Sequence, residues 1–304
     1  MKVLLLVNSS ASSVTARSRV VIQKALSADH DVTLAETSRR GHATRLAQGA
    51  AATGTEAVVV LGGDGTLNEA ANGLAGTSTA LAALPGGSTN VFARTIGLTN
   101  DPIEATGELL DALGRGNIRR VGLGSVNGRY FLFHVGMGFD AAVVAQVERR
   151  AHLKRYAGHP LFVYCGFATW FRHYDKSRPR FAVRHNDGGV VDDGYLAICL
   201  NTNPYTYLGN RPLSLAPEAT LDRGLALVTL RTLDFAKTLR IIGSALGGGH
   251  HLRHSRHVDF HTDLEDVVVE GHGPFPYQVD GDYLGEVERV ELRHVPDILD
   301  LVLP

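Results

Sequence analysis

Residues 61–70 of this chain, Leu-Gly-Gly-Asp-Gly-Thr-Leu-Asn-Glu-Ala, are its most informative stretch. The preceding residues 57–61 are apolar and mostly β-branched, which predicts a buried parallel strand, and residues 66–74 predict a helix. The turn between them, at residues 62–65, holds three glycines and one aspartate. Glycine lets the backbone approach a ligand, so its N–H groups can converge on an anion beside the positive end of the helix. The stretch therefore predicts a phosphate-binding turn.

Asp64 is the unusual residue of this turn, because an acid repels phosphate. A carboxylate there makes chemical sense if a cation shares the site, most simply the magnesium that accompanies a nucleoside triphosphate. The alternative is a tight strand-to-helix turn with a surface aspartate, since one Gly-rich motif alone is a weak signal.

A second loop of small residues, Pro-Gly-Gly-Ser-Thr-Asn, follows at positions 85–90. Apolar runs alternate with Ala-rich helical runs up to about residue 118, which indicates a parallel sheet with helices on both faces. Ligands gather at the carboxyl ends of such strands, so we expect both Gly-rich loops at one crevice. The predicted strands are 3–7, 32–35, 57–61 and 79–84, and the predicted helices lie near 14–28, 41–53, 66–75, 91–96 and 101–114.

The rest of the chain changes character. Asn127-Gly128 and the turn at 186–189 are hairpin signals, so we expect a second, mostly antiparallel domain, consistent with a length of 304 residues. A helical insert at 141–174 mixes basic and aromatic side chains, which suits contact with anionic lipid headgroups. The alternative is an amphipathic helix packed on the sheet with a solvated basic face.

Composition predicts a cytoplasmic globular protein. A net charge of -1 and a hydrophobic content of 44% argue against a disordered chain and against a nucleic-acid binder. The apolar run at 3–7 is too short for a signal peptide, and the run at 161–171 is too short to span a bilayer. Cys165 and Cys199 show no metal or redox spacing and are expected to be reduced core residues.

A histidine cluster invites a metal hypothesis. Four of its members fall on one face if the segment is helical, a spacing that zinc sites use. No acid or cysteine accompanies them at ligand spacing, so a polar loop or helix end is the favoured interpretation. The cluster consists of His250, His251, His254, His257 and His261.

Four motifs in order resemble the diacylglycerol kinase catalytic domain, the family of the bacterial lipid kinases and sphingosine kinases. They are residues 62–69, 85–94, the Gly-Phe-Asp-Ala segment at 138–141 and Asp-Gly-Asp at 280–282 in place of the family's Asp-Gly-Glu. The resemblance implies a nucleotide-binding α/β domain at 1–118, to which 290–304 return, and a β-sandwich lipid-substrate domain at 119–289. It places the active site in the cleft between them, with strand edges that would permit a homodimer.

The resemblance implies ATP-dependent transfer of the γ-phosphoryl group to a lipid hydroxyl, with diacylglycerol as the first candidate acceptor. The enzyme would work in the cytoplasm, at the periphery of the inner membrane face. No Walker lysine motif is present, so backbone N–H groups would hold the phosphates, and Asp64 would hold Mg²⁺ through water. The implied nucleotide-binding residues are Asn8, Thr37, Gly62, Gly63, Asp64, Gly65, Thr66, Leu67, Asn68 and Ser88.

Asp282 stands at the position of the family's glutamate and is the candidate base for the acceptor hydroxyl, with Glu286 as a competitor. If the segment is a strand, Asp280 and Asp282 share a face and raise one pKa; the alternative is a hairpin turn. Asp140 is expected either to contact the polar head of the acceptor or to cap the following helix.

Two departures from the family pattern carry expectations of their own. Asn90 is followed by Val91 where the family has an acid, which leaves the acceptor open. The position of a structural magnesium ligand in bacterial members is Arg223, which cannot ligate a cation, so we expect that site to be absent unless Asp222 or the arginine charge replaces it. The alternatives to a lipid kinase are a catalytically impaired lipid- or nucleotide-binding regulatory protein and a kinase of the NAD kinase type.

Overall fold

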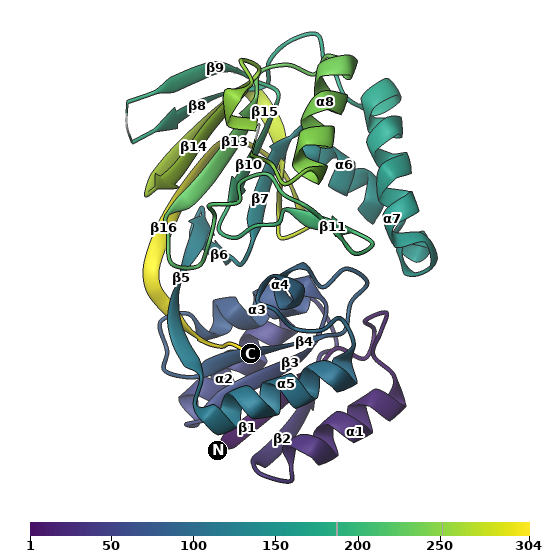
Figure 1. Ribbon diagram of the computed structural model, residues 1–304, viewed down its shortest axis with the longest axis vertical. Coiled ribbons are helices and arrows are strands. Elements are labelled where there is room, and N and C mark those ends of the chain that lie inside the picture. The colour runs from purple at the N-terminus through teal and green to yellow at the C-terminus, as the bar shows by residue number, and fades with distance from the viewer. Residues whose placement is uncertain (187, 251) are drawn as a thin grey trace. The chain divides into compact units, whose positions relative to one another are not determined.

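The computed structural model describes residues 1–186, 188–250 and 252–304, with the backbone alone described at 151–159. The chain divides into two compact units, Met1–Leu123 with Pro296–Pro304, called unit 1, and Gly124–Val295, called unit 2. The strands β5 (Ile118–Val126) and β16 (Asp282–Val302) contribute residues to both units (Figure 1). The domain ends predicted at residues 118 and 289 fall within these two strands.

Unit 1 is built on a parallel sheet with the strand order β4-β3-β1-β2. Every residue of β3 and β4 is buried, as expected for strands that are covered on both faces. Leu301 of β16 pairs with Leu81 of β4 in the parallel sense, so the C-terminal segment extends this sheet. The four strands are β1 (Lys2–Val7), β2 (Asp31–Glu36), β3 (Ala57–Gly62) and β4 (Ala80–Pro85), close to their predicted limits.

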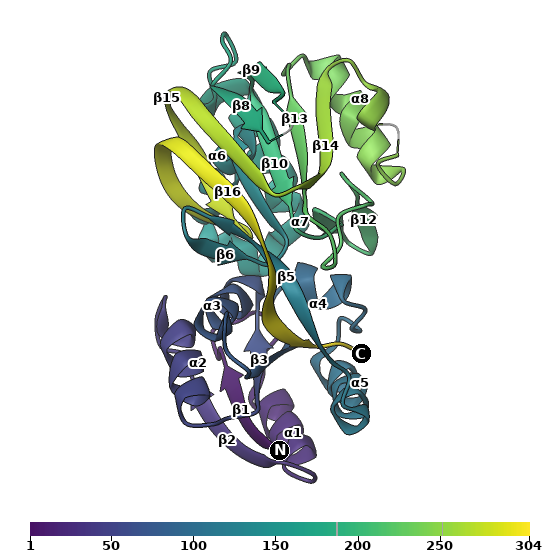
Figure 2. The same ribbon diagram turned by 90° about the vertical axis from the view of Figure 1, so that its left-hand side faces the viewer.

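Helices cover both faces of this sheet. Figure 2 shows α2 and α3 on one face and α1 and α5 on the other. Thr15 caps the first helix through the N–H of Ser18, and Asp101 caps the last through Ile103 and Glu104. The helices are α1 (Ala16–Leu26), α2 (His42–Ala52), α3 (Asp64–Leu74), α4 (Val91–Thr95) and α5 (Pro102–Arg115). The predicted start of α3 at residue 66 is wrong, because the helix begins at Asp64 and includes Gly65.

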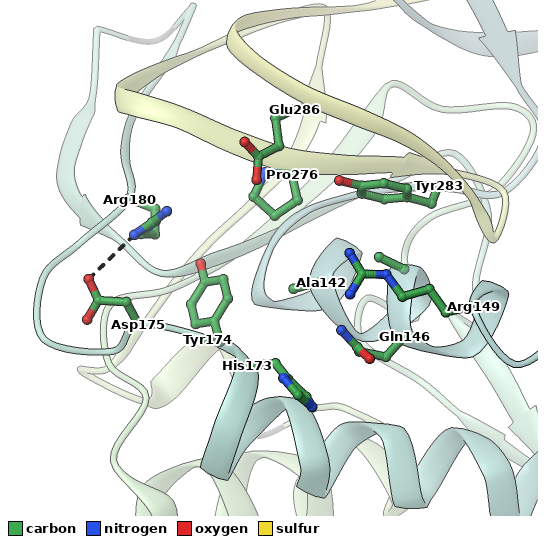
Figure 3. A pocket seen from close by; sticks show the side chains of 11 residues that line it. Ala142, Gln146, Arg149, His173, Tyr174, Asp175, Arg180, Pro276, Tyr283 and Glu286 are labelled. Atoms are coloured by element: carbon green, nitrogen blue, oxygen red, sulfur yellow. Dashed lines mark ion pairs between the residues drawn. The ribbon is translucent and has the colours of Figure 1, made fainter.

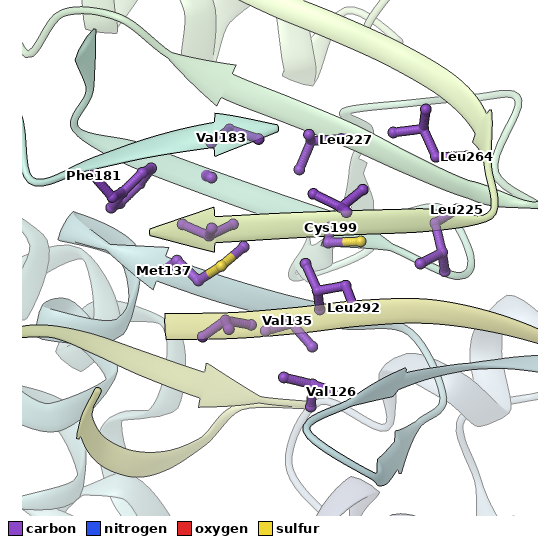
Figure 4. Packing of buried hydrophobic residues seen from close by; sticks show 14 of the residues in the cluster. Val126, Val135, Met137, Phe181, Val183, Cys199, Leu225, Leu227, Leu264 and Leu292 are labelled. Atoms are coloured by element: carbon purple, nitrogen blue, oxygen red, sulfur yellow. The ribbon is translucent and has the colours of Figure 1, made fainter. Parts of the chain in front are cut away.

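Unit 2 consists mainly of antiparallel strands in two layers. β14, β13, β10, β7 and the end of β15 pair in that order, while β8 and β9 pair with the beginning of β15. One buried cluster fills the space between the layers; it includes Met137, Phe181, Cys199 and Leu292 (Figure 4). The remaining strands are β6 (Arg129–Phe131), β7 (His134–Gly138), β8 (Phe181–His185), β9 (Val190–Gly194), β10 (Leu196–Leu200), β13 (Leu225–Leu230), β14 (Val258–Leu264) and β15 (Asp266–Val279), together with β11 (Thr206–Leu208) and β12 (Arg211–Leu213), which pair with each other in a separate small sheet. The predicted fold class, a parallel α/β domain followed by an antiparallel β-sandwich, is confirmed.

The helical insert of unit 2 comprises three successive helices. They are α6 (Phe139–Glu148), α7 (Ala151–Ala168) and the π-helical turn η1 (Thr169–His173). A further helix, α8 (Phe235–Leu246), packs on the opposite face of the β10–β13–β14 layer from the main core. The histidine segment is not one helix, since only residues Leu252–His254 form a short 3-10 turn, η2, and His261 lies in β14. His251 lies outside the described residues.

Candidate active site

The carboxyl ends of the four parallel strands of unit 1 lie at one edge of the sheet, as predicted. The parallel register aligns Val7 with Glu36 and Leu61, and Gly62 with Pro85. Asn8 follows β1, and its side-chain Nδ2 donates a hydrogen bond of 2.9 Å to Oγ1 of Thr66 on α3. Thr37 follows β2, and its backbone N–H donates to the carbonyl oxygen of Val7 at 2.9 Å. The structure therefore brings these predicted nucleotide-binding positions to one edge.

The two Gly-rich loops pack against each other through their backbones. The N–H of Gly86 donates to the carbonyl oxygen of Gly62 at 2.8 Å. A Cβ atom on Gly86 would lie 2.8 Å from the Gly62 nitrogen, and one on Gly87 would lie 2.9 Å from the Gly63 Cα. Such separations are too short for any side chain, so these positions need glycine because two backbones meet there.

Asp64 connects the two loops through its carboxylate. Oδ2 accepts the backbone N–H of Val91 at 3.0 Å, and Oδ1 accepts that of Phe92 at 3.1 Å. These donors belong to the first turn of α4, which has no intrahelical partners for its N–H groups. A carboxylate has about four acceptor positions, so these bonds leave a role toward metal-bound water chemically reasonable. Sequence reasoning missed this structural role, because the donors lie on a separate loop.

Ser88 and Asn68 differ sharply in exposure. Ser88 is exposed in the second Gly-rich loop, whereas Asn68 is 1% exposed inside α3, where its Oδ1 accepts from Asn72 Nδ2 at 3.3 Å. Asn90 shapes the second loop with a φ of 50° and a 2.7 Å hydrogen bond from the N–H of Gly87 to its Oδ1. Leu67 is buried, so its side chain contributes packing.

In unit 2, the Asp-Gly-Asp segment is a hairpin turn. Val279 pairs with Asp282, and the two intervening residues, Asp280 and Gly281, have φ values of 48° and 81°. The interpretation of the segment as a continuous strand is therefore wrong, and the two aspartates do not share a strand face. A two-residue turn with two positive φ angles favours Asp-Gly, which explains the sequence.

Asp280 is a buried structural acid. It is 4% exposed, and its carboxylate accepts the backbone N–H groups of Leu132 at 2.7 Å and of Phe133 and His134 at 3.0 Å each. These bonds fix the connection from β6 to β7. Asp282, in contrast, is half-buried at the start of β16, where the following residue, Tyr283, donates its N–H to Oε1 of Glu148 at 3.0 Å.

A cavity of about 350 Å³ in unit 2 lies beside the start of β16 (Figure 3). Tyr283 and Glu286 line it from β16, Arg149 from the C-terminal cap of α6, and Arg180 from the loop before β8, where its guanidinium lies 3.6 Å from Asp175. Glu286 therefore faces this cavity. The cavity was not predicted, because its residues come from three separate segments, 142–149, 173–180 and 276–286, with no common motif.

Asp140 is buried rather than exposed to solvent. Tyr205 donates its hydroxyl to Oδ1, and Nε2 of Gln278 donates to Oδ2 at 2.9 Å. Burial raises the pKa of the Asp140 carboxyl, although these two hydrogen bonds oppose the rise. A Cβ at Gly136 would lie 1.6 Å from Oδ2, so glycine is required beneath the carboxylate.

The helix that contains Asp140 is capped by Gly138, so the predicted N-cap role of Asp140 is wrong. Oε1 of Gln278 accepts the N–H of Gly281 at 2.8 Å, while its Nε2 binds Asp140. This one fully buried glutamine links the Gly-Phe-Asp-Ala segment to the Asp-Gly-Asp turn. Sequence reasoning missed Gln278 and Tyr205, because neither belongs to a recognisable motif.

Two further groups of side chains lie apart from this network. Arg223 forms a two-pronged ion pair with Asp263, with Nε 2.9 Å from Oδ1, at an exposed site. Of the histidine cluster, His261 lies near Asp259 and His185, and one potential ligand atom from each lies within 4.8 Å of the others. Among the described residues, the other histidines of that cluster do not join such a group. Cys165 and Cys199 are both buried and unbridged.

Comparison with known proteins identifies the chain. The family model "Diacylglycerol kinase catalytic domain" matches residues 2–126. A probable lipid kinase YegS-like of Pseudomonas aeruginosa is 32% identical over 254 residues, covering 82% of this chain and 78% of the relative. A diacylglycerol kinase of Bacillus subtilis is 29% identical over 281 residues, covering 90% of this chain and 88% of the relative.

Solved structures share the fold. A putative diacylglycerol kinase from Bacillus anthracis covers 100% of this chain and 95% of its own, with a TM-score of 0.79 and 23% identity. An NAD kinase from Archaeoglobus fulgidus in complex with ATP covers 99% of this chain and 93% of its own, with a TM-score of 0.53 and 12% identity.

The fold, the motifs and these relatives define a phosphotransferase that acts on a lipid alcohol. The chain belongs to the diacylglycerol kinase catalytic domain family. In the part of the chain that the structure describes, no helix has the length and apolarity needed to cross a bilayer.

Proposed function

We propose that this enzyme transfers the γ-phosphoryl group of ATP to the hydroxyl of diacylglycerol. The observation that carries the proposal is the backbone contact between the two Gly-rich loops, which holds the second loop against the glycine turn at the N-terminus of α3. A helix N-terminus with converging N–H groups suits an anionic phosphate chain. Diacylglycerol is proposed because a Bacillus subtilis relative that aligns over 90% of this chain is a diacylglycerol kinase.

In this proposal unit 1 binds the nucleotide. The backbone at Gly62, Gly63, Gly65 and Thr66 cradles the phosphates, and the nearby edge contributes Asn8, Thr37, Asn68 and Ser88. Asp64 would accept hydrogen bonds from water bound to Mg²⁺, which supplies charge neutralisation for phosphoryl transfer when bound. Its hydrogen bonds to α4 hold the carboxylate in a fixed orientation for that task.

Unit 2 supplies the acceptor site and the base. Asp282 accepts the proton of the acceptor hydroxyl as the phosphoryl group arrives. Asp280 fixes the turn that carries Asp282, and Gln278 connects that turn to Asp140. Because Asp140 is 6% exposed, we assign it to positioning within this buried network rather than to a direct contact with the acceptor head. Glu286 faces the cavity and is the alternative base.

The test is transfer of radiolabel from γ-labelled ATP to a panel of lipids in the presence of Mg²⁺. The panel holds diacylglycerol, monoacylglycerol, a long-chain base and phosphatidylglycerol, with NAD as a non-lipid acceptor. We expect diacylglycerol to have the highest kcat/KM. Preferred labelling of another lipid would correct the acceptor alone, and labelling of NAD instead of any lipid would contradict the proposal.

A further inference from the structure

Helix α8 carries large apolar side chains on two opposite faces. Its inner face places Ile241 and Ala245 in the buried cluster that also contains residues of β10, β13 and β14. Its outer face is apolar as well, although it meets solvent. The spacing of four, three and four residues aligns the outer side chains in one stripe. They are Phe235, Leu239, Ile242 and Leu246, each between 42% and 47% exposed.

A second exposed stripe continues this surface on α7 and η1. Phe171 is 67% exposed, and its ring centroid lies 5.9 Å from that of Phe235. Trp170 contacts Phe235 edge-on at 5.8 Å between centroids, so the two stripes meet at Phe235. The outer apolar face is defined by these two stripes together: Val163, Tyr164, Phe167 and Phe171, with Phe235, Leu239, Ile242 and Leu246.

The concentration of these side chains is unusual for a solvated surface. Among the described residues, the outer apolar face holds eight of the thirteen exposed large hydrophobic side chains. A surface helix normally turns polar residues outward, and a contiguous exposed apolar patch marks an interaction surface. The outer apolar face therefore indicates a binding partner that accepts apolar side chains.

The charges around this face are positive. Nζ of Lys176 lies 4.9 Å from the Trp170 ring centroid and 5.7 Å from that of Phe171. Lys237 and Arg240 lie on α8 and Arg172 on η1, whereas residues 160–173 and 235–246 contain no aspartate or glutamate. Asp234 at the start of α8 accepts the N–H of Lys237 as an N-cap. Apolar side chains bordered by lysine and arginine match an anionic phospholipid surface.

The same charges argue against a second copy as the partner. In a two-fold dimer through this face, the cations of one copy would meet the identical cations of the other. Neither stripe offers an acid to pair with them. A bilayer, in contrast, supplies apolar chains for the stripes and anionic headgroups for the border.

The outer apolar face also adjoins the cavity of unit 2 along the chain. Phe171 belongs to the face, while His173, Tyr174 and Asp175 line the cavity only a few residues later. A bilayer on the face would therefore bring lipid headgroups near the cavity rim.

We propose that the outer apolar face docks this enzyme on an anionic phospholipid bilayer. Helix α8 would lie in the interface, with Leu239 and Ile242 among the acyl chains and Lys237 and Arg240 at the headgroups. The biological purpose of docking rests on the proposed function, because the acceptor then lies in the same bilayer. Vesicle binding itself requires neither ATP nor turnover.

The experiment measures cosedimentation of the full chain with vesicles of phosphatidylcholine alone or mixed with phosphatidylglycerol. The test variant is the double substitution Leu239→Ser and Ile242→Ser. Its matched control is Ile103→Ser, a side chain 42% exposed on α5. We expect the double variant to lose at least about tenfold in its partition coefficient for mixed vesicles, because two apolar side chains no longer enter the interface. The control should bind like the wild type.

A second variant tests the charges independently of the apolar stripe. Lys237→Gln with Arg240→Gln should lower binding to mixed vesicles by about fivefold per charge and leave binding to phosphatidylcholine nearly unchanged. Equal binding of both double variants and wild type would overturn the proposal. The proposal would also be overturned if neither the wild type nor the serine variant bound vesicles, while the wild type formed a dimer and the serine variant was a monomer. That result would assign the outer apolar face to contact with a second copy.

A soluble, short-chain diacylglycerol separates this proposal from the proposed function. If docking is correct, the serine variant phosphorylates the short-chain lipid at the wild-type rate but phosphorylates diacylglycerol in mixed vesicles more slowly. If the chain binds vesicles through this face but phosphorylates neither substrate, the proposed function fails and the docking proposal stands. If it phosphorylates the short-chain lipid but binds no vesicles, docking fails and the proposed function stands.

Discussion

Oδ2 of Asp64 accepts the backbone N–H of Val91 at 3.0 Å, so the acid of the first Gly-rich loop holds the residue that begins the helix after the second. The other oxygen accepts the N–H of Phe92. One carboxylate thus orders the second loop, and in our proposal it also binds the Mg²⁺ of ATP through water. Substitutions can separate the two roles. Accepting a backbone hydrogen bond requires only an oxygen atom, whereas binding Mg²⁺ requires the negative charge of the carboxylate.

Asp64→Ala removes both acceptors and should lower the free energy of unfolding by about 1–3 kcal/mol. Asp64→Asn keeps one carbonyl oxygen and should lose less stability, yet it removes the charge and should lose most of the phosphoryl transfer. Urea unfolding and kinase assays across a Mg²⁺ titration measure the two effects. If Asp64→Asn keeps wild-type transfer at limiting Mg²⁺, Asp64 is a structural residue only.

Gly87→Ala should push the two Gly-rich loops apart, because its Cβ would lie 2.9 Å from the Gly63 Cα. We expect a stability loss of about 1–3 kcal/mol and weaker ATP binding, since the glycine turn before α3 is displaced from its position against the second loop. Isothermal titration with ATP measures the second effect. Gly107→Ala on α5 is the matched control, because its Cβ would meet nothing within 4 Å, and it should stabilise by up to about 1 kcal/mol. Unchanged ATP affinity in Gly87→Ala would refute the proposal that the packing of the two Gly-rich loops forms the phosphate-binding site.

Substitution of Asp280 should cost much more stability than substitution of Asp282. Asp280→Ala leaves three buried backbone N–H groups without their acceptor, which should cost about 3 kcal/mol or more of stability. Asp282→Ala should change stability by less than about 1 kcal/mol. Thermal unfolding of the two variants under identical conditions provides the comparison. A large loss of stability for Asp282→Ala alone would show that Asp282, and not Asp280, is the structural acid of the turn.

His134 should make the protein sensitive to acid. Burial lowers its pKa from 6.5 to about 3, and its Nδ1 has no hydrogen-bond partner among the residues that the structure describes. Between these values the unfolded chain binds a proton that the folded chain does not, so stability falls as the pH falls below 6.5. The slope from this group is at most about 1.4 kcal/mol per pH unit.

His134→Leu should remove this contribution. Urea unfolding of wild type and variant at several pH values between neutral and acidic is the measurement. The variant should gain stability relative to wild type as the pH falls. A difference between the two that stays constant with pH would contradict the buried neutral state of His134.

The strands and helices of unit 1 could be predicted from the sequence, because the apolar runs and turn residues that indicate them are local. Five-residue apolar runs ending in glycine or proline predict β3 and β4, and parallel pairing then brings their following loops to one edge. The same reasoning cannot find the partners of a side chain. Nothing near Asp64 in the sequence indicates that its carboxylate holds Val91 and Phe92.

The site residues of unit 2 were harder to predict, because their hydrogen-bond partners lie far away in the sequence. Asp280 binds the backbone 146 to 148 positions earlier in the chain, and Asp140 binds Tyr205 and Gln278 at separations of 65 and 138. Such contacts arise from sheet pairing and leave no periodic pattern. The histidine segment agrees with the favoured interpretation of a polar loop or helix end, since among its described residues η2 spans only Leu252–His254 and His261 lies in β14.

In the proposed reaction, Asp282 is the base for ATP-dependent phosphorylation of a lipid alcohol. The most direct measurement is the kcat for radiolabel transfer from γ-labelled ATP to diacylglycerol by wild type and by Asp282→Asn, with ATP affinity and unfolding measured on both. We expect transfer by wild type and a loss of about 10²–10⁴ in kcat for the variant, with unchanged ATP affinity and stability. Undiminished transfer by Asp282→Asn, or ATP binding by wild type without transfer to any lipid alcohol, would contradict the proposed reaction.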